Sequence, residues 1–146
     1  MKIKKIISLL IACTLSILCF AIPVYAESDS DTDSGTTVTR DNSRPTANWN
    51  LSTNGQYNFS GYAAGTADIY SLYNFTGVDP MCISVRNLGS TYTITVKLIK
   101  NALIDYTVET FTVAPGQRRV VTVDVSSTSR YYLSFSAPCS FDGFIL

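Results

Sequence analysis

The residues best suited to chemistry in this chain are scattered carboxylates, because the sequence contains no histidine. Without an imidazole there is no Ser-His-Asp or Cys-His pair for nucleophilic catalysis. A glycosidase would need two carboxylates flanking a cleft. Asp105 and Glu109 are the closest such pair in the predicted domain, yet four residues along a strand separate them by about 13 Å. The sequence therefore predicts no catalytic residues, no cofactor and no enzyme.

Metal ligands and phosphate loops are also sparse. Asp29, Asp31 and Asp33 have the spacing of the first ligands of an EF-hand calcium loop. The pattern then fails, because Gly35 comes one place late and Arg40 stands where a bidentate glutamate is needed. No glycine-rich phosphate loop is present. We expect an acidic, solvated segment here and no metal site.

Aromatic side chains are better candidates for binding a ligand. The chain after residue 26 holds eight Tyr, six Phe and one Trp. Several rings share a strand face with Asn and Ser, and such rings can stack on sugars or anchor a protein partner. The alternative is that they cover the rim of the fold. The rings predicted to face the core are Tyr57, Phe59, Tyr73, Tyr92, Phe111 and Phe135. The predicted ligand-binding residues are Trp49, Tyr62, Tyr70, Tyr132, Arg118 and Arg119. The two arginines could donate hydrogen bonds to a carboxylate of the ligand.

The first 26 residues predict export from the cell. Lys2, Lys4 and Lys5 precede an apolar run over 6–24, and the segment closes with Val24-Tyr25-Ala26. A basic start, an apolar middle and a small-residue end are typical of a secretory signal peptide. We expect a secreted, extracellular product that keeps no stable membrane anchor.

Two alternatives to a cleaved signal remain open. The apolar run is about long enough to span a bilayer, and the residues before Cys13 resemble a lipobox. Pro23 and the cleavage-like ending favour removal of the segment over both alternatives.

After removal of the signal peptide, eight basic and eleven acidic residues remain, a net charge of −3. No basic field is left to suggest nucleic acid as a partner.

The cysteines of the exported part are Cys82 and Cys139. In an oxidising compartment two cysteines predict one disulfide, worth about 4 kcal/mol in the chain-entropy model. The alternative is a pair of free thiols. Two cysteines without histidine make a poor zinc site.

The exported part divides into a tail and a domain. Residues 27–48 are rich in Ser, Thr and Asp, and they cannot bury enough surface to offset the cost of ordering. We expect them to be flexible. Residues 49–146 read as short strands that recur every eight to twelve residues with no helical periodicity, which is typical of an all-β fold.

The clearest strand spans Ser90–Lys100. Tyr92, Ile94, Val96 and Leu98 alternate with polar residues, as in a half-buried antiparallel strand. The whole pattern predicts an antiparallel β-sandwich, of jelly-roll or immunoglobulin-like type. Other predicted strands include Gln56–Tyr62, Asp68–Phe75, Cys82–Leu88 and a terminal strand Phe141–Leu146 paired inside a sheet.

Two connections can also be predicted. In a regular strand Val108 and Phe111 would lie on opposite faces. A one-residue bulge near Glu109 would place both side chains on the same face. Ala114–Gln117 has Pro and Gly in the central places of a type II turn.

Three classes of function fit these features. The first hypothesis is a small secreted recognition module for a glycan or a surface protein. The second is a structural or self-associating extracellular protein that pairs through edge strands. The third is a membrane-active, toxin-like protein. The sequence does not distinguish the ligand or the oligomeric state.

Overall fold

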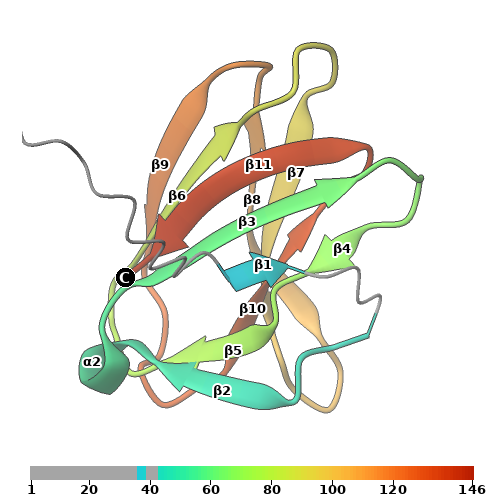
Figure 1. Cartoon of the computed structure of the whole chain (residues 1–146). Coiled ribbons are helices and arrows are strands. Elements are labelled where there is room, and N and C mark those ends of the chain that lie inside the picture. Colours follow the sequence, from blue (N-terminus) through green and yellow to red (C-terminus); the bar gives the residue numbers. More distant parts are fainter. Residues whose placement is uncertain (1–35, 39–42) are drawn as a thin grey trace, which may run out of the picture. The chain divides into compact units, whose positions relative to one another are not determined.

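A computed structural model describes residues 36–38 and 43–146 of the chain. The predicted signal peptide, 1–26, the acidic segment that resembles a calcium loop and most of the predicted tail lie outside the described residues. The described part is an all-β fold of eleven strands in two sheets, with a single helical turn, α2 (Leu51–Asn54) (Figure 1). Within it no helix has the length and apolar character needed to cross a bilayer.

The first sheet has five strands in the order β1-β3-β11-β6-β9. The C-terminal strand β11 is central and pairs antiparallel with β3 on one side and β6 on the other. The prediction that the apolar end of the chain pairs inside a sheet is confirmed. The strands are β1 (Thr36–Val38), β3 (Tyr57–Ala63), β6 (Met81–Asn87), β9 (Arg118–Val123) and β11 (Cys139–Ile145).

The second sheet has six strands in the order β2-β5-β10-β7-β8, with β4 pairing to β10 beside this path. Strand β1 and the first two residues of β2 come from the stretch predicted as a tail. Two edge pairs, β1 with β3 and β2 with β5, are parallel, so an entirely antiparallel arrangement is wrong for these edges. The strands are β2 (Ala47–Asn50), β4 (Ile69–Tyr70), β5 (Tyr73–Thr76), β7 (Ile94–Lys100), β8 (Tyr106–Val113) and β10 (Tyr131–Phe135).

The predicted strand Asp68–Phe75 is two strands, β4 and β5, because Ser71 interrupts it. The Ser71 hydroxyl accepts a hydrogen bond from Leu133 N at 3.0 Å and donates one to Tyr73 O at 3.0 Å. The side chain thus replaces a backbone group of the ladder with β10, and the chain bends between the two short strands.

The hairpin of β7 and β8 contains the predicted bulge. Leu98 faces Glu109 while Ile99 faces Thr107, so Val108 is the additional residue on β8. After β8, Gln117 N donates to Ala114 O at 3.1 Å and Gly116 has φ +70°, as the predicted type II turn requires. This turn carries the chain from the second sheet to β9 of the first.

One hydrophobic core takes side chains from both sheets. Phe135 of β10 stacks on Phe141 of β11, with ring centroids 3.9 Å apart and an interplanar angle of 15°. Phe59 of β3 lies 5.7 Å from Phe135 and 6.2 Å from Phe141, in tilted and edge-on contacts. These three rings join the sheets at the centre of the core.

The alternation predicted for Ser90–Lys100 is confirmed in its second half only. Ile94, Val96 and Leu98 are fully buried, whereas Tyr92 is 59% exposed. The strand begins at Ile94, so Tyr92 belongs to the loop that precedes it. The prediction of Tyr92 as a core residue is wrong.

The predicted disulfide is also wrong, because Cys82 and Cys139 are both free. Cys139 begins β11, whereas Cys82 exchanges backbone hydrogen bonds of 2.8 and 3.0 Å with Leu146, just past the other end of β11. Seven residues of extended chain separate these two positions, about 23 Å. A disulfide needs Cα atoms within about 7 Å. The pairing that places β11 beside β6 therefore keeps the two thiols apart.

The close approach of β11 to its neighbours gives a test of this fold. A Cβ added at Gly143 would collide with the backbone carbonyl of Ser84 on β6 and lie 2.7 Å from the ring of Phe59 on β3. Because a paired backbone carbonyl cannot rotate away, we predict that Gly143→Ala lowers the free energy of unfolding by about 3 kcal/mol. Urea denaturation followed by circular dichroism measures this change.

Gly65 provides the matched control. A Cβ there meets nothing within 4 Å, so Gly65→Ala should leave stability unchanged or raise it by up to about 1 kcal/mol. Equal midpoints for the two variants would contradict the central position of β11.

Candidate functional site

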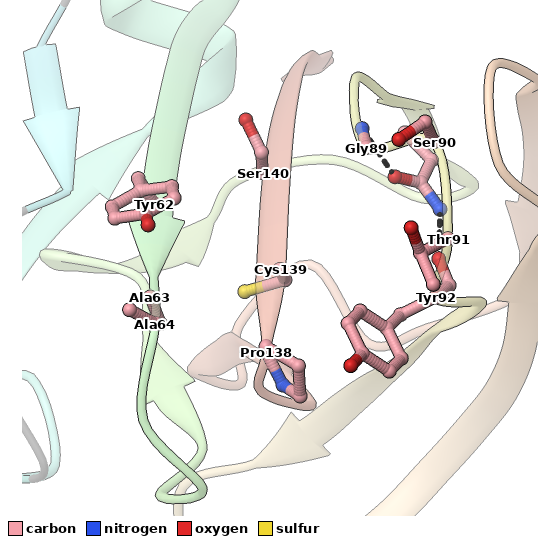
Figure 2. A pocket seen from close by; sticks show the side chains of 11 residues that line it. Tyr62, Ala63, Ala64, Gly89, Ser90, Thr91, Tyr92, Pro138, Cys139 and Ser140 are labelled. Carbon is pink, nitrogen blue, oxygen red and sulfur yellow. Dashed lines mark hydrogen bonds between the residues drawn. The ribbon is translucent and has the colours of Figure 1, made fainter.

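A groove opens between β3, the start of β11 and the loop that joins β6 to β7 (Figure 2). Its volume is about 470 Å³, within the range of small-molecule sites. Ser, Thr and Asn side chains line it together with two aromatic rings and a small apolar floor. The lining residues are Tyr62, Ala63, Ala64, Asn87, Gly89, Ser90, Thr91, Tyr92, Pro138, Cys139 and Ser140.

The two rings are Tyr62 and Tyr92, and they come from different walls. Tyr62 is 62% exposed and lies on β3, while Tyr92 is 59% exposed and lies in the loop before β7. Figure 2 shows them on either side of Pro138 and Cys139. Each therefore presents an aromatic surface to whatever occupies the groove.

The pleat of β3 positions Tyr62. Tyr57, Phe59 and Ala63 are buried, whereas Asn58 and Tyr62 are exposed on the opposite face. Tyr62 pairs with Ser140 of β11, and this register brings a hydroxyl beside the ring. The prediction that Tyr62 lies on the exposed face of its strand is confirmed.

A buried amide positions Tyr92. Asn87, only 1% exposed, donates to Tyr92 O at 2.8 Å and to Val113 O at 3.0 Å. Its Oδ1 accepts from Gly89 N at 2.9 Å. One side chain thus satisfies three backbone groups of the loop and of β8, and it holds the backbone of Tyr92 in place.

The floor of the groove is neutral. Cys139 is 7% exposed, and burial raises the pKa of its thiol from 9.0 to about 11. The group is therefore a protonated thiol at neutral pH and a poor nucleophile. Among the described residues, the lining includes no acidic and no basic side chain, and such a lining is suited to stacking and hydrogen bonding with an uncharged ligand.

The six predicted ligand-binding residues do not form one site. Tyr62 lines the groove, but Tyr132 is only 4% exposed, and the expectation that it is exposed is wrong. Its hydroxyl donates to Asp105 Oδ2 at 2.7 Å, and the same oxygen is 2.7 Å from Arg44 Nε. Tyr70 covers the Tyr132 ring edge-on at 5.6 Å. Burial and the bond to Asp105 raise the pKa of Tyr132.

Trp49 lies at the edge of the core. Its Nε1 donates to Gly55 O at 3.0 Å, and its ring lies 5.1 Å from Tyr57 and 5.6 Å from Tyr73. The residue is half-buried and packs against the core cluster. These contacts indicate a structural role.

The two predicted arginines bind groups of their own chain. Arg118 lies 3.1 Å from Asp142 and donates to Ser84 Oγ at 2.9 Å. Arg119 stacks 5.8 Å from the centroid of Phe111 and donates to Thr112 O at 3.3 Å. Neither arginine lines the groove.

Sequence reasoning missed Tyr92 as a site residue because its parity continues that of Ile94, Val96 and Leu98. The available signal was the turn-forming Gly89-Ser90-Thr91 directly before it, which indicates a loop.

No group of three or more potential metal ligands occurs among residues 43–146. Comparison with known proteins found no matching family model, curated protein or solved structure.

The chemistry of Cys139 gives a prediction. Because its pKa is raised to about 11, about one thiol in a thousand is ionised at pH 8. In a Cys82→Ser variant, alkylation of Cys139 by iodoacetamide should accelerate about tenfold per pH unit and show no plateau near pH 9. Peptide-resolved mass spectrometry measures the rate.

The wild-type protein supplies the control for that measurement. Half-buried Cys82 should be alkylated without prior reduction, because no disulfide holds it. A requirement for reductant, or a plateau for Cys139 near pH 9, would contradict the description of this floor.

Proposed function

We propose that this chain is a secreted β-sandwich module that recognises an uncharged glycan in the groove between Tyr62 and Tyr92. The observation that carries the proposal is the pair of exposed tyrosine rings on two walls of a groove whose described lining combines apolar surface with Ser, Thr and Asn side chains and includes no charged side chain.

A sandwich is supported by the contribution of both sheets to one core. The stacking of Phe135 on Phe141 and the contact of Phe59 with Phe135 each connect one sheet to the other. Export is supported by the pattern of residues 1–26. An extracellular product would meet glycans in quantity, on cell surfaces and in secreted polymers.

The chemistry of the groove matches that of a sugar ring. One face of a pyranose presents C–H bonds that pack on an aromatic ring, and its edge carries hydroxyls. Ser90, Thr91 and Ser140 supply hydroxyl groups that both donate and accept hydrogen bonds. An acidic sugar would need a cation to offset its desolvation, and the described lining supplies none, so a neutral sugar is favoured.

The affinity for one sugar unit should be low. At roughly 0.3 kcal/mol per non-hydrogen atom, a hexose of about twelve such atoms binds with a Kd in the millimolar range. Binding without catalysis is consistent with the described lining, which holds no carboxylate pair and whose thiol is protonated. A protein ligand is the alternative occupant. It would need about 800 Å² of surface on this chain, which extends well beyond the groove.

A glycan array with the purified chain, followed by calorimetry on the best neutral ligand, tests the proposal. Tyr62→Ala and Tyr92→Ala should each weaken binding by about tenfold, because each removes one stacking surface worth roughly 1.4 kcal/mol. Tyr106→Ala is the matched control. Its ring is 54% exposed, but it lies at the opposite end of the β7–β8 hairpin, and its loss should leave the affinity unchanged.

Two outcomes would overturn the proposal. The first is equal binding by all three variants. The second is an array without hits from a protein whose sedimentation depends on concentration, which would assign this chain to self-association through its edge strands.

A further inference from the structure

The turn between β7 and β8 projects two adjacent aliphatic side chains into solvent. Leu103 is 98% exposed and Ile104 is 80% exposed, more than any other large apolar residue of the described chain. Single exposed apolar residues are ordinary on protein surfaces. Two at the apex of one turn, in contact with almost nothing of their own chain, indicate a binding function.

The turn is held in a defined conformation. Asp105 Oδ1 accepts a hydrogen bond from Ala102 N at 3.2 Å, which closes the turn on itself. Asp105 Oδ2 accepts from the Tyr132 hydroxyl and pairs with Arg44, both at 2.7 Å. The Asp105 side chain is only 14% exposed. The exposure of the aliphatic pair therefore results from a turn anchored to β10.

Amphipathic residues flank the tip. Lys100 and Tyr106 end β7 and begin β8, with Lys100 Nζ 5.8 Å from the centroid of the Tyr106 ring. Arg130 is exposed beside the base of the turn, where its carbonyl accepts from Asn101 N at 2.8 Å. This order of side chains matches the layers of a bilayer. The aliphatic tip suits the hydrocarbon, the tyrosine suits the interface, and the long cationic side chains suit the headgroups.

We propose that residues 102–104 insert into the interface of a phospholipid bilayer. Because Leu103 buries almost none of its surface against the described part of the chain, a protein partner would need a preformed pocket around a convex tip. A fluid bilayer accommodates such a tip without one. The inference is independent of the proposed glycan site.

Burial of the aliphatic side chains supplies most of the free energy of binding to the bilayer, and charge contributes less. Asp105 is neutralised by Arg44, which leaves Lys100 and Arg130 to face headgroup phosphates. Asp79 and Asp124 line the hollow beside Lys100 and Tyr106 and reduce the positive field. Binding should therefore occur on phosphatidylcholine and increase only modestly with phosphatidylserine.

Co-sedimentation with sucrose-loaded vesicles of phosphatidylcholine, with and without phosphatidylserine, tests the proposal. Mass spectrometry first verifies that every preparation of the full chain begins at the same residue, so that the amino-terminal segment contributes equally. Leu103→Asn with Ile104→Asn should reduce the partition coefficient at least tenfold, because two buried aliphatic side chains are lost.

Val120→Asn is the matched control. Val120 is 56% exposed on the edge strand β9, and its substitution should leave partitioning unchanged. Since all three positions are exposed, the variants should retain the wild-type melting temperature. Leu103→Trp adds a direct readout: its emission should shift to the blue on vesicle addition and be quenched by brominated lipid.

The contrary results are equally specific. Equal sedimentation of wild type and the double variant would overturn the proposal, as would a Leu103→Trp emission that vesicles do not change. If the wild type instead dimerises and the double variant does not, with no vesicle binding by either, the partner of this tip is a second copy.

Discussion

The insertion of β11 between β3 and β6 is the constraint on which the rest of this structure depends. It requires glycine at position 143, because the Ser84 carbonyl and the Phe59 ring leave no room for a Cβ. It also brings Phe141 face to face with Phe135 of the other sheet. Strand β11 thus links its two neighbours in one sheet to the core shared with the second sheet.

The same insertion assembles the groove. β3 carries Tyr62 on one side of β11, and β6 leads through Asn87 into the loop with Tyr92 on the other side. Cys139, the first residue of β11, becomes the floor between them. The two tyrosines are about 30 residues apart in the sequence, and the order of the strands brings them to the same groove. The buried Asn87 side chain fixes the conformation of the loop that carries Tyr92.

Strand order also explains what could be predicted from the sequence. The Val108 bulge, the Ala114–Gln117 turn and the alternation from Ile94 onward depend on residues close together in the chain, and those predictions were confirmed. The exposure of Tyr62 was predictable for the same reason. Local patterns specify which face of a strand a residue occupies and where the chain turns.

The wrong predictions for Tyr132 and for the disulfide concerned environments that come from distant segments, whereas Tyr92 lies in a loop that the turn residues directly before it indicate. Tyr132 is on the outer face of β10, as parity indicates, yet Tyr70 and Arg44 cover that face. Two cysteines in a domain expected to be exported suggest a bridge, but they lie at opposite ends of β11 because of its register with β6. Alternation cannot reveal what covers a face or which strands become neighbours.

The β7–β8 hairpin relates the two proposals to each other. Tyr92 precedes β7 and Leu103 follows it, so seven residues of strand, about 20 Å, separate the groove from the aliphatic tip. Each interaction alone would be weak. Linked weak sites strengthen one another only when both ligands can be engaged together. Since the two proposed sites lie at opposite ends of the hairpin, they can strengthen each other only for ligands that reach both ends at once.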